Sequence, residues 1–146
     1  MKKIISIVII AVVVIISISV LSSEKKPEKT AVYHIMLADP KIYNNGIFTD
    51  TFQIQNGSYQ FRFVSHGQSP QTLSITLNSP KFSFSEDFKL EGIPRDTGIS
   101  TYYTWDYLGV KEIIVTENQQ LEIVINPHGN ILDTVSVYLI KTSRHI

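Results

Sequence analysis

The residues best suited to bind or transform another molecule form one aromatic run, residues 102–107 (YYTWDY). Side chains alternate between the two faces of a strand, so Tyr103, Trp105 and Tyr107 share one face, while Tyr102 and Asp106 share the other. If the first face points inward, Trp105 fills the core and the tyrosine hydroxyls reach solvent at the rim, which is the interpretation we prefer. If it points outward, the rings beside Asp106 form a platform for stacking on sugar rings or for docking a partner.

Other residues with catalytic or metal-binding side chains are scattered, and the chain has no cysteine. Glu86 and Asp87 are adjacent, so in a strand they point to opposite faces and do not converge on a substrate. His66 and His128 each precede a glycine, and no further ligand lies at a fixed spacing, so we expect them in turns and not in a metal site. We therefore predict a non-enzymatic protein with no catalytic residue, no metal and no cofactor.

Asn56 begins the triplet Asn-Gly-Ser, which is an acceptor for N-glycosylation on an exported domain. The same Asn56-Gly57 pair is also the strongest short signal for a type I′ turn between two alternating strands. Both interpretations stay open, and we expect a β-hairpin over residues 48–64.

One segment occurs twice, because residues 56–77 align without a gap with residues 118–139, which lie 62 positions later. Six positions are identical: Asn56/Asn118, His66/His128, Gly67/Gly129, Thr72/Thr134, Ser74/Ser136 and Leu77/Leu139. The apolar alternation keeps the same phase in both copies. We therefore predict two equivalent hairpins that share one core, with Phe61 and Ile123 at matching inward positions.

The elements that must position these residues are strands. From residue 31 onward, apolar and polar residues alternate between turns rich in Gly, Pro and Asn. The pattern predicts an all-β domain, a single two-sheet β-sandwich of jelly-roll or immunoglobulin-like type with about eight strands. We expect strands at residues 81–90, 100–108 and 111–116, with an irregular loop from Gly92 to Gly98.

The N-terminal part predicts a membrane segment. Residues 4–21 are apolar apart from three serines and carry no charge, and at about 1.5 Å per residue they would span about 27 Å, close to the roughly 30 Å of a bilayer core. We divide the chain into a transmembrane anchor (residues 1–21), a polar tether (residues 22–30) and the β-sandwich domain (residues 31–146). The alternative for the first part is a cleaved signal, which would leave the domain secreted.

The charge of the predicted domain excludes one class of partner. Beyond residue 30 the chain has eight Lys and Arg residues against eleven Asp and Glu residues, a net charge of −3. Nucleic-acid binding needs a basic surface, so we expect no nucleic-acid partner. The remaining expected partners are the membrane, through residues 4–21, and a protein or glycan outside it.

The anchor and tether, together with the strand patterns of residues 48–77 and 113–141, resemble small uncharacterised membrane-anchored β-sandwich proteins of ammonia-oxidising archaea. The shared outline is an alternating strand, an Asn or Gly turn, a second alternating strand, a Gly turn and a strand of L-S-I-T-L type. This resemblance implies an exported accessory domain and carries no catalytic residue onto the chain.

We therefore predict a single-pass cell-membrane protein whose extracytoplasmic sandwich serves surface or protein–protein interaction. The alternative is a carbohydrate- or small-ligand-binding module that uses the aromatic run at residues 102–107.

Overall fold

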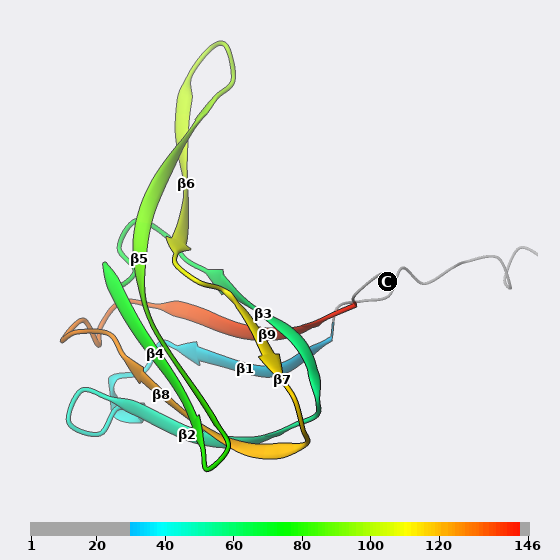
Figure 1. Cartoon of the computed structure of the whole chain (residues 1–146). Helices are drawn as coiled ribbons and strands as arrows, with labels where there is room; N and C mark the ends of the chain where they lie inside the picture. The colour runs from blue at the N-terminus through cyan, green and yellow to red at the C-terminus, as the bar shows by residue number, and fades with distance from the viewer. Residues whose placement is uncertain (1–29, 144–146) are drawn as a thin grey trace, which may run out of the picture.

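The computed structural model describes residues 30–143, which form two antiparallel β-sheets (Figure 1). The strands are β1 (Ala31–Leu37), β2 (Phe48–Ile54), β3 (Gly57–Val64), β4 (Thr72–Ser79), β5 (Phe82–Asp96), β6 (Thr101–Leu108), β7 (Glu112–Val115), β8 (Gln119–Asn126) and β9 (Val135–Thr142), with one short 3-10 helix, η1 (Pro40–Ile42). The predicted membrane segment at residues 4–21 lies outside the described residues. Within residues 30–143, no helix has the length and apolar character needed to cross a membrane.

The two sheets confirm the predicted two-sheet architecture. One sheet has the order β1-β9-β3-β7, and the other has the order β2-β8-β4-β5-β6. The described residues thus contain nine strands where the sequence predicted about eight. The predicted strands at residues 81–90 and 100–108 are present as β5 and β6, and β5 continues to Asp96.

The core lies between the two sheets and follows the alternation in the sequence. Phe61 and Ile123 are both buried, which confirms their predicted inward orientation. The Phe61 ring packs against three further aromatic rings of the core, those of Phe63, Phe84 and Phe88. Every second residue of β3, β4, β8 and β9 therefore contributes to one shared apolar layer.

The repeated segments occupy equivalent positions, related by a pseudo-twofold axis. Phe61 of β3 pairs with Leu139 of β9, and 62 positions away Ile123 of β8 pairs with Leu77 of β4. The preceding strands follow the same rule, since β2 pairs with β8 and β7 pairs with β3. At one end of the sandwich the two matching asparagines touch, and the Asn56 backbone N–H donates to Asn118 Oδ1 at 2.9 Å.

The predicted hairpin over residues 48–64 is wrong, and so is the description of each copy as a hairpin. β2 and β3 belong to different sheets, and so do β3 and β4. The Asn56-Gly57 link crosses from one sheet to the other, and Asn56 is not among the residues with positive φ. Alternation predicts an inward face, but it does not tell whether two successive strands pair with each other or face each other across the core.

A tight turn of the predicted kind forms elsewhere, at Asn45-Gly46. These residues have φ values of 51° and 79°, and the flanking Asn44 and Ile47 exchange backbone hydrogen bonds of 2.8 and 3.1 Å. Positive φ at both central positions is what a type I′ turn requires.

The predicted loop from Gly92 to Gly98 is also wrong over most of its length, because β5 continues to Asp96. β4 pairs with β5 only as far as Lys89, and beyond that point β6 is the one strand of residues 30–143 that pairs with β5. Pro94 therefore lies in a two-stranded ribbon, where a residue without an N–H can face the open side. This ribbon projects away from the sandwich (Figure 1).

Candidate functional site

The candidate site lies on the projecting part of the β5–β6 ribbon, residues 91–106, which we call the outer hairpin. Its register pairs Gly92 with Trp105 and Pro94 with Tyr103. Directly opposed residues of an antiparallel pair share a face, so these four residues lie on the face that continues from the core.

Tyr107 holds the base of this face in the core. Its side chain is fully buried, its hydroxyl donates to the Pro70 carbonyl at 2.6 Å, and its ring lies 4.9 Å from that of Phe63. Burial raises the pKa of the Tyr107 phenol well above its ordinary value. Of the three residues predicted to point inward, only Tyr107 lies in the core, and its hydroxyl is buried against Pro70 where the sequence predicted that it would reach solvent.

The prediction that Trp105 fills the core is wrong. Trp105 is 37% exposed and Tyr103 is 57% exposed. The physical reason is the length of the opposing strand, because β3 ends at Val64. Beyond Tyr107, the hairpin faces the loop between β3 and β4, which covers only part of the indole.

Two glycines fix the position of the Trp105 indole. A Cβ atom added to Gly67 or to Gly92 would lie 3.0 Å from carbon atoms of the ring, so the indole packs directly on both backbones. The Ser65 hydroxyl also donates to the Trp105 carbonyl at 2.8 Å. The indole is therefore held in one place while part of it faces solvent.

Tyr103 and Trp105 together form what we call the aromatic strip. Their ring centroids are 6.4 Å apart, and the ring planes meet at 37°. Tyr102 lies on the opposite face of the hairpin and is also exposed, while Ile99 at the tip is 98% exposed. The outer hairpin thus exposes four large apolar side chains to solvent, those of Ile99, Tyr102, Tyr103 and Trp105.

A polar hollow of about 390 Å³ borders the strip, lined by Gln60, Phe61, Arg62, Phe63, Trp105, Asp106, Lys111 and Ile140. Lys111 Nζ forms an ion pair with Asp106 Oδ2 at 2.7 Å and lies 5.8 Å from the centre of the Phe63 ring. The hollow lies beside β3 where its pairing with β7 stops at Gln60. Asp106 was predicted as a site residue, but its partner Lys111 was missed because it lies beyond the end of β6, where the alternation of the strand stops.

The sequence also gave no sign of a cluster of Ser74, Asp87 and His128 on the outer face of the five-stranded sheet. The Ser74 hydroxyl donates to Asp87 Oδ1 and lies 2.6 Å from His128 Nε2. A hydroxyl has one proton, so with that proton given to Asp87 the imidazole must be the donor in its contact with Ser74. In this arrangement His128 does not act as a base on Ser74, and the cluster lacks the order of a hydrolytic triad.

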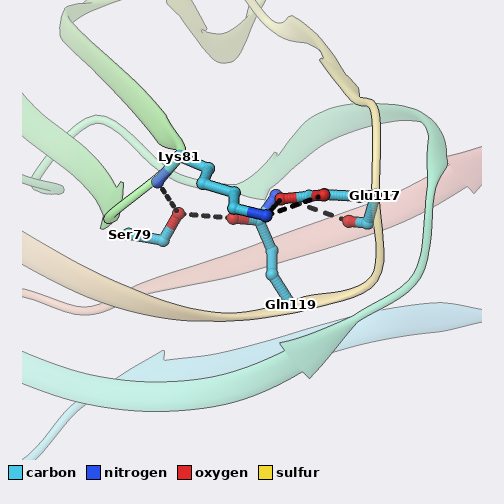
Figure 2. Close-up of polar contacts among 4 residues, drawn as sticks. All are labelled: Ser79, Lys81, Glu117 and Gln119. Carbon is cyan, nitrogen blue, oxygen red and sulfur yellow. Dashed lines mark hydrogen bonds and ion pairs between the residues drawn. The ribbon is translucent and has the colours of Figure 1, made fainter.

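A second and larger hollow, of about 610 Å³, lies at the end of the sandwich away from the outer hairpin. Figure 2 shows the polar contacts at its rim, where Lys81 Nζ lies 3.0 Å from Glu117 Oε1 and Ser79 donates to the Gln119 amide oxygen. The Gln119 amide nitrogen also contacts the Glu117 carbonyl. These contacts join the β4–β5 turn to the β7–β8 turn, and the hollow contains no aromatic ring.

The remaining predicted residue, Asn56, is exposed in the link between β2 and β3. Its backbone N–H is bonded to Asn118, so this link is held in place. Among residues 30–143, no group of three or more His, Cys, Asp or Glu side chains is arranged to hold a metal ion.

No family model, curated protein or solved structure matches this chain.

Proposed function

We propose that this chain is a non-enzymatic binding module, tethered to the cell membrane by residues 4–21, whose β-domain lies outside the membrane and contacts its partner through the outer hairpin. The observation that carries the proposal is the exposure of Tyr103, Trp105 and Ile99 on one projecting ribbon. Large apolar side chains that gather in solvent on one projecting element are characteristic of an interaction site.

The pseudo-twofold arrangement supports the same assignment. β5 occupies beside β4 the position that β1 occupies beside β9, so these two strands complete the symmetry of the sheets. β6 has no counterpart among the described strands, because in the other sheet β1 is an edge. The repeated strands are therefore fully paired without the outer hairpin, which leaves that hairpin available for contact with a partner.

The strand order supports a finer description of the fold. β1-β9-β3-β7 facing β2-β8-β4-β5 is the order of a jelly roll, to which β6 is added at one edge. Lectin domains are among the proteins built on this architecture. A fold hosts many functions, so the site and not the strand order carries the functional proposal.

The location outside the membrane is supported by the sequence. The uncharged run at residues 4–21 follows a short basic segment, and the polar segment at residues 22–30 is suited to spacing the domain from a bilayer. In this location Asn56, on an exposed link, is open to N-glycosylation in a cell that modifies asparagine.

Site-specific photo-crosslinking in the full chain tests the proposal. A benzophenone amino acid replaces Tyr103 in one variant and Ile114 in a control, because both side chains are 57% exposed while Ile114 lies on β7, away from the outer hairpin. We expect a discrete adduct from position 103 and none from position 114 in membranes of cells that produce the protein. The absence of an adduct at 103, or the same adducts at both positions, would contradict the proposed contact surface.

A further inference from the structure

We infer that the ligand of the outer hairpin is a neutral carbohydrate, bound by the aromatic strip and the polar hollow beside it. This inference rests on the proposed function, because it names the class of molecule that the proposed contact surface recognises. It combines features that lie next to each other on the molecule, namely exposed rings, a fixed indole, and a hollow whose charges are largely balanced.

The exposed rings and the side chains of the hollow match the two kinds of surface on a sugar ring. A pyranose has an apolar face of C–H groups and a rim of hydroxyls, so it needs an aromatic surface and hydrogen-bonding side chains at once. Tyr103 and Trp105 provide the aromatic surface, and Trp105 also lines the hollow. The Gln60 amide and the Arg62 guanidinium line the same hollow and suit hydroxyl groups as donors or acceptors.

The charges of the hollow favour a neutral ligand over an anionic one. Asp106 and Lys111 neutralise each other through their 2.7 Å contact, which leaves Arg62 as the one unbalanced cation among the residues that line the hollow. A phosphate-rich ligand such as a nucleic acid requires several cations. An uncharged molecule with many hydroxyls fits this set of side chains better.

The charges of the hairpin tip argue against insertion into a membrane. Arg95 and Asp96 lie immediately before the turn that carries Ile99. Burial of Ile99 in the hydrocarbon layer would bring both charged groups close to it, and ionised side chains are costly there. A protein partner would need roughly 800 Å² on each side, of which the two rings of the strip supply a minor part.

The strip is also prepared for binding before the ligand arrives. The backbones of Gly67 and Gly92 pack directly against the indole, and the Ser65 hydroxyl donates a hydrogen bond to the Trp105 carbonyl. A ring that is already fixed loses little conformational entropy when a ligand stacks on it. A small ligand makes few contacts, so a low entropy cost of ordering the site raises its affinity noticeably.

The test uses the full chain in detergent and the fluorescence of its single tryptophan. The probes are cellohexaose, chitohexaose, xylohexaose and mannohexaose, each titrated to about 10 mM, a range that covers weak binding. We expect at least one probe to change the Trp105 emission saturably, and we expect Tyr103→Ala to weaken that binding about tenfold through loss of one stacked ring. Ile114→Ala should leave the binding constant unchanged.

Two results would overturn the inference: no saturable change with any of the four probes, or binding that Tyr103→Ala leaves intact. The crosslinking experiment separates this failure from a failure of the proposed function. A polypeptide adduct at position 103 without saccharide binding would refute the carbohydrate and leave the contact surface standing. The absence of both would refute the contact surface itself.

Discussion

Replacing Phe61 by alanine tests the described core at a buried residue whose ring packs against three other aromatic rings. Phe61 is 1% exposed, and its ring centroid lies 6.3 Å from that of Phe63 and 5.7 Å from those of Phe84 and Phe88. Truncating a buried Phe to Ala costs about 3–5 kcal/mol of the free energy of unfolding. Three aromatic pairs are lost at once, each worth about 0.5–1.5 kcal/mol beyond its buried area, so we expect a loss near the upper end of that range.

The pseudo-twofold equivalent Ile123→Ala provides the comparison, and the exposed Ile114→Ala provides the control. Ile123 is fully buried in the opposite sheet, so its truncation should cost about 2–5 kcal/mol, whereas the control should cost less than about 0.5 kcal/mol. The measurement is urea unfolding of the full chain in detergent, followed by circular dichroism at a wavelength dominated by strand. A loss below about 1 kcal/mol for Phe61→Ala, or a severe loss at one of the two equivalent positions with none at the other, would refute the shared core.

Three further predictions concern the environment of single side chains and of the N-terminal segment. Because Trp105 is partly exposed, iodide should quench its emission in the folded protein; an emission that becomes accessible only on unfolding would contradict the position described here. Burial raises the pKa of the Tyr107 phenol, and burial followed by the nearby Asp50 raises that of Tyr33. The two buried phenols therefore stabilise the folded protein below the ordinary phenol pKa of about 10. Above that pH this stabilisation is lost, because the phenols of the unfolded chain ionise first. A free energy of unfolding that stays constant up to about pH 11 would contradict this prediction. The run at residues 4–21 predicts that the full chain stays with membranes after carbonate extraction, and recovery in the soluble fraction with a shortened N-terminus would show a cleaved signal instead.

Alternation in the sequence was sufficient to predict which residues form the core. Phe61, Ile123 and Tyr107 all point inward as expected, because a strand with one buried face places its apolar residues at every second position. The same alternation could not predict strand pairing. A link such as Asn56-Gly57 joins two inward faces equally well when the strands lie side by side and when they lie in opposite sheets.

The sequence predicted which residues belong to the candidate site, but it did not predict how exposed they are or which residues they contact. Residues 102–107 were predicted as the candidate run, but whether Trp105 is covered depends on where β3 ends, about 40 residues earlier in the sequence. Pairs such as Asp106 with Lys111, and the contact of Ser74 with His128, arise from the sheet arrangement. Ser74 and His128 are 54 positions apart, and Asp106 and Lys111, although only five apart, meet across the turn after β6, so alternation along one strand predicts neither contact.

The exchange of strands between the two copies has a consequence for the origin of the fold. Each copy has its pairing partners in the other copy, since β3 pairs with β9 and β8 pairs with β4. A chain with only one copy would therefore expose unpaired strand edges, whereas two such chains related by a twofold axis would satisfy each other, as in an isologous dimer. We expect an ancestor of half this length to have been an obligate homodimer, whose fusion placed both subunits on one chain. β5 is then the second subunit's counterpart of β1, and β6, which has no counterpart, is an addition between β5 and β7.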